Sequence, residues 1–498
     1  MITPPPSGEP GFTRALDLRS AIAVNMTQMC GIGPFLTIPL MVAAMGGPQA
    51  IFAWLLGAVL AMADGLVWAE LGAAMPGAGG SYLYLREAYQ YRTGRLMPFL
   101  FVWTIILAVP LITSTGVIGI VQYLAYYFPS LNATPAAGDG ALQALLSPAH
   151  LKVTAISLGV VGVAVATLYR GIHAIGRLAN VLFVVMLVTV GLMIAACATH
   201  FDPKLAFAFT PGAFRWEGAF WAGLGQGLIF AIYDYAGYNT TACIGEEIIN
   251  PGRVLPKSII YSIIGIMAIY LTMNVGVMGV LPWKDVAAST SIGSLIMERA
   301  WGRNAAMGFT LLVILTGFAS IVAGLLGASR IPYNAAKDKL FFRSFARLHP
   351  RLHFPHVGLL VMGIITAVAS FFPLDQVINM MTAAIVLIQG VAQVAALTVL
   401  RRRQPRLPRP YRQALYPLPS LIAMAGWCYA YYKSGKPMIE LSLVWLGLGV
   451  VAFLVWAWFE RTWPFGPIEI REEFVEEIRP PGPASPGLER AGGGADAG

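Results

Sequence analysis

Long apolar runs that recur twelve times are the feature that most limits how this chain can fold. A helix that crosses a membrane needs about 20 mostly apolar residues. Because 57% of the 498 residues are hydrophobic and only 11% are charged, the sequence predicts an all-α integral membrane protein with about twelve transmembrane helices. The predicted spans are residues 19–45, 48–74, 96–128, 151–169, 178–198, 217–245, 257–281, 305–328, 356–373, 377–400, 414–432 and 439–459.

Basic residues set the predicted orientation of these spans. Six lysines and arginines lie in the loop 329–356, and six arginines lie in 401–412. Twelve spans put both loops on the same side as the two termini, and the positive-inside rule makes that side the cytoplasmic face of a cell membrane. The net charge of +9 is thereby explained by loops beside membrane lipid, and we expect no nucleic-acid partner.

The first span is interrupted at its middle by Gly31, Gly33 and Pro34. Inside lipid every backbone N–H and C=O needs an internal partner, so a helix breaks only where protein or a cavity supplies one. Proline suits the start of a new helix because it has no N–H to leave unpaired. The pattern predicts a helix that ends near Cys30 and a second half-helix that starts at Pro34, with a simple proline kink as the alternative.

A second interruption favours the broken helix over the kink. The sixth span, 217–245, carries Ala236 and Gly237 at mid-membrane beside the acid Asp234. Paired breaks in corresponding helices are typical of inverted repeats with a binding site at the membrane midplane. Because spans one and six are five apart, the sequence predicts two repeats of five helices, with two extra C-terminal helices.

This count divides the chain into five predicted segments. They are a cytoplasmic N-terminal segment (1–17), a first repeat (18–200), a second repeat (201–403), helices eleven and twelve (404–464) and a disordered cytoplasmic tail (465–498). The tail is rich in Pro, Gly and Glu, a composition that cannot bury enough apolar surface to fold.

No pattern in the sequence indicates an enzyme, a cofactor or a metal site. His349, His353 and His356 lie in a basic loop without the carboxylate or cysteine neighbours that metal sites use. The four cysteines are scattered through predicted spans without paired spacing, so we interpret them as packing residues.

Four motifs, in order along the chain, resemble those of the amino acid–polyamine–organocation transporters. The family's glycine motif in the first span, of Gly-Ser-Gly-Ile-Phe type, resembles 31-GIGPF-35, from which Ile32 and Pro34 depart. The resemblance covers about residues 14–460. The other three motifs are 69-AELGAAMPGAGGSYLYLREAY-89, 245-GEEIINPGRVLPKSI-259 and 329-SRIPYNAAKDKLFFRSFARLHPRLHFP-355.

The resemblance implies the leucine-transporter type of fold, in which helices one and six are unwound at mid-membrane. Spans one, two, six and seven would rock against a scaffold of spans three, four, five, eight, nine and ten. It further implies secondary active transport of amino acids or related amines such as polyamines, by exchange or by coupling to a proton or another ion. A carrier specific for polyamines and a non-transporting membrane sensor on the same scaffold are the alternatives.

The first break is the predicted site for a substrate carboxylate. A half-helix that starts at Pro34 would direct its free N–H groups and partial positive charge into the site. N–H groups around Ile32, Gly33 and Phe35 would hold the carboxylate, and the glycines, including Gly31, would let it reach the backbone. Pro34 cannot donate, so the site has one donor fewer than the family pattern, and polyamines would need no such cradle.

The second break is the predicted site for the substrate's ammonium group. The half-helix that ends near Tyr233 would offer its C-terminal carbonyls. When the chain is aligned on Asn250-Pro251, the resemblance places Tyr233 where family members carry an aromatic gate. Ordinary packing is the alternative, because 230-FAIYDYAGY-238 is rich in aromatic residues throughout.

Polar residues around the second break complete the predicted binding site. Asp234 either partners a second ammonium group, which favours a cationic substrate, or caps the half-helix that follows. Ala236 and Gly237 form the break itself, and Gln28 and Asn239 are expected to line the site.

Two further residues are candidates for coupling. Asp64 lies well inside span two, where burying an acid costs free energy. Three roles are open for it: a proton carrier, a counter-charge for an amine, or a hydrogen-bond acceptor towards span six or seven. Some family members place a lysine in span five, but here Asn180 is the only amide and no lysine is present in 178–195.

Overall fold

The computed structural model describes residues 14–77, 79–132, 148–169, 172–215, 217–349 and 354–461. The predicted tail, 465–498, lies outside the described residues, as does most of the N-terminal segment 1–17. Within the described part the chain is helical, and its β-structure is limited to one isolated bridge between Leu16 and Ile248.

Each predicted span coincides with a helix or with a broken helix. In chain order the spans are α1 (Leu18–Met29) with α2 (Gly33–Met45), α3 (Ile51–Ala74), α5 (Leu96–Tyr127), α7 (Pro148–Leu168), α8 (Ile172–Thr199), α10 (Gly218–Tyr235) with α11 (Thr240–Cys243), α12 (Pro251–Val280), α15 (Arg303–Lys337), α16 (His356–Ala369), α17 (Leu374–Ile385) continued by the π-helical η5 (Val386–Ala392) and α18 (Gln393–Arg403), α19 (Leu418–Lys433) and α20 (Lys436–Phe459). Shorter helices connect them, namely α4 (Ser81–Thr93), α9 (Pro203–Ala206), α13 (Trp283–Ala288) and α14 (Ile292–Trp301).

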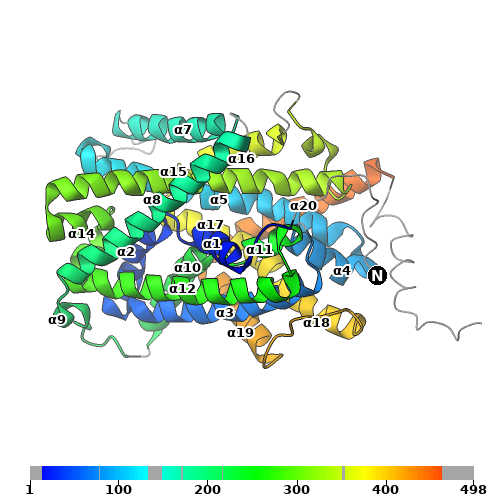
Figure 1. The fold of residues 1–498 in the computed structure, drawn as a ribbon, viewed down its shortest axis with the longest axis horizontal. Coiled ribbons are helices and arrows are strands. Elements are labelled where there is room, and N and C mark those ends of the chain that lie inside the picture. The colour runs from blue at the N-terminus through cyan, green and yellow to red at the C-terminus, as the bar shows by residue number, and fades with distance from the viewer. Residues whose placement is uncertain are drawn as a thin grey trace, which may run out of the picture.

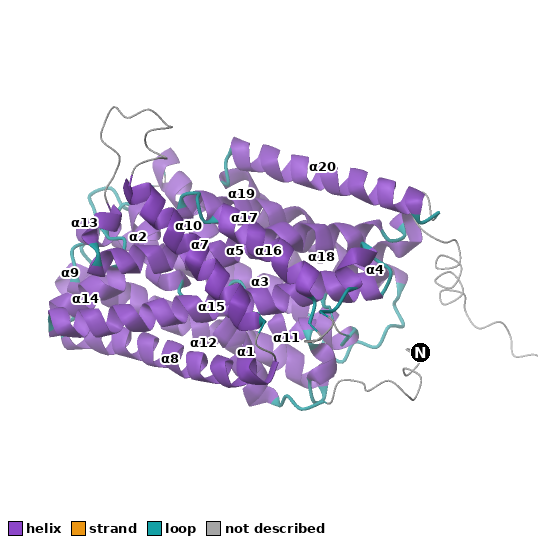
Figure 2. Cartoon of the chain, turned by 90° about the horizontal axis from the view of Figure 1, so that it is seen from above, coloured by secondary structure: helices purple, strands orange, loops and turns teal. Residues whose placement is uncertain are grey.

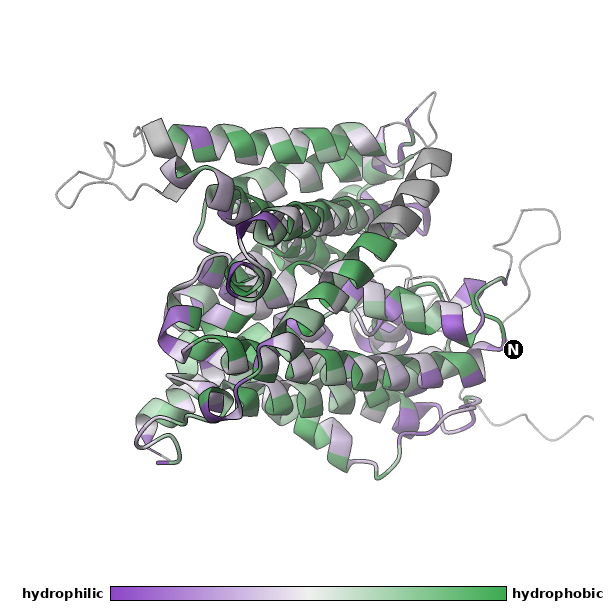
Figure 3. Ribbon diagram, turned by 60° about the vertical axis from the view of Figure 1, so that its left-hand side comes forward, coloured by the Kyte–Doolittle hydropathy of each residue, from purple (hydrophilic) through white to green (hydrophobic). Residues whose placement is uncertain are grey.

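Length and hydropathy identify the molecule as a membrane protein. Among the described helices, seven are long and apolar enough to cross a membrane alone, and α1 with α2, bent by 52° at their break, make an eighth. The other predicted spans coincide with α8, α10, α16 and α19, whose described parts do not meet that criterion individually. Hydrophobic residues predominate along the helices in Figure 3. The predicted all-α membrane fold is confirmed.

The helices pack as two groups. In one group α12 lies along α3 and contacts α1, while α10 packs against α2 and α3. In the other group α5 packs against α15, α16 and α17, and α15 also contacts α8. Figure 1 shows α3, α12 and α15 running along the long axis, with α8 crossing them obliquely. These groups correspond to the two sets of spans that the family resemblance implies.

A pair of tryptophans attaches α20 to α5. Figure 2 shows α20 at the edge of the molecule. The Trp103 indole N–H donates to the Trp445 carbonyl at 2.9 Å, and the Trp445 indole N–H donates to the Trp103 carbonyl at 3.3 Å. The two rings stack with centroids 4.9 Å apart.

Glu70 anchors the end of span two to the segment that follows span ten. Its carboxylate is fully buried and accepts a hydrogen bond at 2.8 Å from Arg401 Nε. Arg409 Nε lies 3.6 Å away, and the backbone N–H of Gln413 donates at 2.7 Å. Arg86, the basic residue nearest to Glu70 along the chain, instead pairs with the adjacent Glu87 at 3.0 Å.

The Glu70 cluster should contribute strongly to stability. Glu70→Gln leaves two guanidinium groups without their carboxylate, and we expect it to lower the free energy of unfolding by about 3 kcal/mol. Glu87→Gln breaks a more exposed pair and should cost less than about 1 kcal/mol. Denaturant unfolding of the purified variants measures both values, and equal losses would contradict a special role for Glu70.

Candidate functional site

The first break leaves two backbone donors without a partner. Helix α1 ends at Met29 and α2 begins at Gly33, so Pro34 is the second residue of α2 and not, as predicted, the first. The Phe35 N–H donates to the Ile32 carbonyl at 3.1 Å. The structure describes no acceptor for the N–H groups of Ile32 and Gly33. Of the three amides expected to face a ligand, two are therefore free.

The second break interrupts span six directly after Tyr235. Ala236 is extended, with φ −60° and ψ 131°, and Gly237 has a φ of 122°, which glycine adopts without a steric penalty. The helix resumes as α11 at Thr240. Both predicted breaks are thus present in the structure.

The two breaks lie directly against each other and against span eight. A Cβ atom on Gly237 would come within 2.9 Å of Gln28 Cγ, and one on Gly31 would come within 2.6 Å of Ser320 Oγ. At Gly33 a Cβ would collide with Asp234 Oδ1 and would come within 3.2 Å of the Tyr233 ring. We expected these glycines to make room for a ligand, but in this structure neighbouring protein groups use that room.

Tyr270 joins the ends of the two broken helices. Its hydroxyl, on α12, lies 2.8 Å from the Met29 carbonyl at the end of α1 and 3.1 Å from the Asp234 carbonyl in the last turn of α10. Carbonyl groups at helix C-termini have no partner within their own helix. One buried hydroxyl therefore serves both helix ends, and it holds them in a fixed relation to α12.

Asp234 points at the start of α2. The residue is 1% exposed, and its Oδ2 accepts a hydrogen bond at 2.5 Å from Thr37 Oγ1. Its Oδ1 has no hydrogen-bond partner in the described part of the chain. The predicted capping of the following half-helix is not observed, because α10 continues through Asp234 to Tyr235, and α11 begins at Thr240 with Asn239 before it and no side-chain cap.

Tyr233 lies across Gly33 and reaches the scaffold. Its hydroxyl is 2.5 Å from Thr115 Oγ1 on α5. Ile32 and Phe35 are buried by packing, with the Phe35 ring edge-on to Phe309 at a centroid distance of 5.9 Å. Tyr233 is thus the aromatic side chain placed between the two breaks and α5.

Asp64 lies in a separate polar contact. Tyr238 donates to Oδ2 at 2.6 Å, and the Trp427 indole donates to Oδ1 at 3.1 Å. The first of these is the hydrogen bond to span six that was one alternative for Asp64. Trp427 packs on Gly390 within the π-helical η5. The side chain of Asn180 lies outside the described residues.

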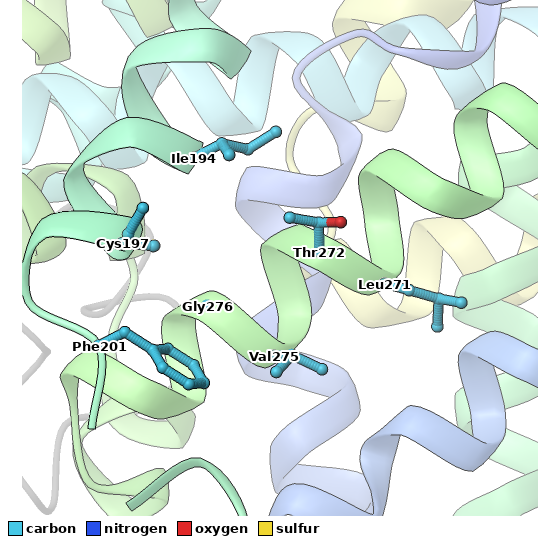
Figure 4. A pocket seen from close by; sticks show the side chains of 8 residues that line it. Ile194, Cys197, Phe201, Leu271, Thr272, Val275 and Gly276 are labelled. Carbon is cyan, nitrogen blue, oxygen red and sulfur yellow. The ribbon is translucent and has the colours of Figure 1, made fainter. Parts of the chain in front are cut away.

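One described cavity lies away from the breaks. A mostly apolar space of about 580 Å³ opens between α8 and α12 (Figure 4), lined by Cys197, Phe201, Thr272 and Gly276 among others. The described residues contain no group of three or more His, Cys, Asp or Glu side chains that could hold a metal ion.

Sequence reasoning missed four residues that contact the predicted site. Thr37, Thr115 and Tyr270 bond Asp234 or Tyr233, and Trp427 bonds Asp64. All four are hydroxyl or indole groups within apolar runs, where they follow no motif. A polar atom inside a predicted span was the signal available, since such an atom needs a partner there.

The hydroxyl of Tyr270 can be tested without changing the ring. We expect Tyr270→Phe to lower the free energy of unfolding by about 1–3 kcal/mol, since the buried Asp234 carbonyl loses the hydroxyl that donates to it and the Met29 carbonyl keeps only the Gly31 N–H. Tyr261 lies on the same helix but is 51% exposed, so Tyr261→Phe should have no measurable effect. Similar denaturant midpoints for the two variants would contradict the proposed role of Tyr270 at the helix ends.

Comparisons with known proteins agree with this architecture. A family model described as "Amino acid permease" matches residues 16–466. The chain is 27% identical over 465 residues to the branched-chain amino acid permease BcaP of Bacillus subtilis (strain 168), covering 91% of this chain and 94% of that protein. It is 24% identical to the serine/threonine exchanger SteT of the same organism, over 86% of this chain and 92% of that protein. It is also 24% identical to cationic amino acid transporter 4 of Mus musculus, over 73% of this chain and 56% of that protein. The chain therefore belongs to the amino acid permease family.

Proposed function

We propose that the protein is a secondary active transporter that carries an amino acid across the cell membrane by alternating access. The observation that carries this proposal is the pair of free amides, Ile32 and Gly33, at the start of α2 between two broken helices. A permease needs to recognise what all amino acids share, and a helix N-terminus recognises a carboxylate. The names of the relatives, which describe amino acid permeases and exchangers, support the same class of substrate.

The substrate would lie between the two breaks. Its carboxylate would accept hydrogen bonds from the amides of Ile32 and Gly33, and its ammonium group would face the carbonyl end of α10. Gln28, Ala236 and Asn239, which are at least partly accessible, would line the path beside them. The roles of these residues follow from their placement at the ends of the half-helices.

Tyr233 would act as the lid of this site. Its ring covers Gly33, and its hydroxyl bonds Thr115 across the boundary between the two helix groups. Displacement of this ring is needed before a carboxylate can reach the Gly33 amide. Because this lid is hydrogen-bonded to α5, the presence of substrate in the site would affect how α10 is positioned relative to the scaffold.

We further propose an amino acid with an uncharged side chain. Asp234 was the reason to expect a cationic substrate, but its free oxygen faces Gly33, at the end where the substrate carboxylate would bind. A second ammonium group at that end would compete with the amide N–H groups for the substrate carboxylate, and binding would gain nothing from it.

The two termini are proposed to be cytoplasmic, because of the basic loops 329–356 and 401–412.

Transport by the purified protein tests this function. Proteoliposomes loaded with unlabelled leucine should take up radiolabelled leucine by exchange, and unlabelled leucine or serine should compete better than lysine or putrescine. Leucine that stabilises the protein without any flux would indicate the sensor. Strongest competition by putrescine would indicate the polyamine carrier.

Close approach at Gly33 gives a second expectation. Gly33→Ala should reduce leucine exchange by tenfold or more, a factor that corresponds to about 1.4 kcal/mol, because its Cβ displaces Asp234 and Tyr233 from the positions that form the site. Gly327 has no heavy atom within 4 Å of an added Cβ, so Gly327→Ala is the matched control and should exchange leucine like the wild type. Equal rates for the two variants would exclude Gly33 from the site.

A further inference from the structure

The arginine loop, residues 401–417, carries positive charge that the described part of the chain does not neutralise. It joins α18 to α19 and contains six arginines, at positions 401, 402, 403, 406, 409 and 412. Arg402, Arg406 and Arg412 are exposed, and no described acid forms an ion pair with any of them. These three guanidinium groups are thus open to a partner outside the chain.

Hydrogen bonds within the arginine loop fix its shape. The Arg409 guanidinium donates at 3.0 Å to the carbonyls of Leu400 and Gln404, where α18 ends. It also donates at 3.1 Å to the Leu407 carbonyl and lies 3.6 Å from the buried carboxylate of Glu70. A ligand would therefore meet a preorganised surface, and binding would need little further ordering of the backbone.

Exposed leucines follow the exposed arginines along the chain. Leu415 is 78% exposed, and Leu418 and Leu421, which are three residues apart on α19, are 52% and 60% exposed. Leu415 also has a φ of 56°, a left-handed conformation that bulky residues rarely adopt. A leucine that is both exposed and strained is unfavourable in water, whereas in a membrane its side chain can contact acyl chains.

Positive charge beside exposed leucines matches the chemistry of a bilayer surface. Helix α18 ends span ten and α19 forms span eleven, and the two pack against each other (Figure 1), so the arginine loop lies at the level of the lipid headgroups. Arginines at this level attract anionic headgroups, and apolar side chains enter the acyl region. We propose that the arginine loop binds anionic phospholipid, with Arg402, Arg406 and Arg412 at the headgroup and Leu415 among the acyl chains.

This site is independent of what the protein transports, and it connects the lipid to span two. The same loop holds the Glu70 carboxylate through Arg401, Arg409 and the Gln413 N–H. A lipid bound to the loop would stabilise this anchor. An acidic segment of a soluble protein is the competing partner, but it would offer no acyl chain to Leu415.

Native mass spectrometry of the detergent-solubilised full chain tests the binding. The wild type should bind dioleoyl phosphatidylglycerol about a hundredfold more tightly than the triple variant Arg402→Gln, Arg406→Gln, Arg412→Gln, the combined effect of three arginines at a membrane surface. Dioleoyl phosphatidylcholine, which has no net charge, should bind both proteins alike. Equal affinities of the wild type and the triple variant for phosphatidylglycerol would overturn the proposal.

A matched control removes the same charge from the other side of the predicted membrane. Lys204, Arg299 and Arg303 are exposed cations there, and their triple glutamine variant should keep the wild-type affinity for phosphatidylglycerol. An equal loss of affinity in this control would show attraction to net charge alone and would contradict a site at the arginine loop.

The melting temperature in detergent distinguishes the possible partners. Phosphatidylglycerol should raise the Tm of the wild type, whereas sn-glycerol 3-phosphate or polyglutamate at the same concentration should not. A rise with glycerol phosphate equal to that with the lipid would identify a free phosphate site and overturn the proposal. A rise with polyglutamate and none with the lipid would identify an acidic protein partner and would do the same.

Leu415→Asn separates lipid binding from folding. Asparagine adopts the left-handed conformation more readily than leucine, so without added lipid this variant should melt at the wild-type temperature or above it. Phosphatidylglycerol should nevertheless raise its Tm by less than it raises that of the wild type. A lower Tm without lipid, together with an unchanged rise when lipid is added, would assign Leu415 to folding and overturn its part in the site.

Discussion

Every backbone donor and acceptor in the apolar interior of a membrane must be paired within the protein, and the two helix breaks are where side chains meet this demand. Tyr270 serves the carbonyl ends of α1 and α10. Asn25, which is fully buried on α1, accepts a hydrogen bond at 3.0 Å from the Thr241 N–H in α11. Each half-helix is thereby fixed by a residue of another helix. The structure describes no such acceptor for the amides of Ile32 and Gly33 at the start of α2, and these two amides are the basis of the proposed site.

Three buried acids illustrate three ways in which this chain accommodates a carboxyl group. Glu70 is held by two arginines and a backbone N–H. Asp64 accepts from two neutral donors, one on each oxygen. Asp234 has a single hydroxyl donor. The cost of burying an ionised group falls as its donors increase, so the three form a series in which Asp234 is the carboxyl group with the fewest donors.

The positions of the spans and of both breaks could be predicted from sequence, because apolar length and interrupting glycines are local signals. The partners could not. Thr37 and Asp234 are 197 residues apart, and Trp427 and Asp64 are 363 apart, so no spacing rule connects them. The proposed cap by Asp234 failed for a related reason: α10 continues one residue past the acid, and a local motif cannot show which neighbouring helix its side chain will reach. Arg86 is the basic residue nearest to Glu70 along the chain, yet the fold brings Arg401 and Arg409 to it.

The exchanged hydrogen bonds between Trp103 and Trp445 have a consequence for how firmly α20 is attached. Each indole N–H donates to the main-chain carbonyl of the other residue, and the two rings cover each other. Loss of one ring would remove one hydrogen bond and the stacking contact, but the other indole would keep its acceptor, because a main-chain carbonyl is present whatever the side chain. The attachment of α20 to α5 is therefore divided between two contacts, one of which survives the loss of the other.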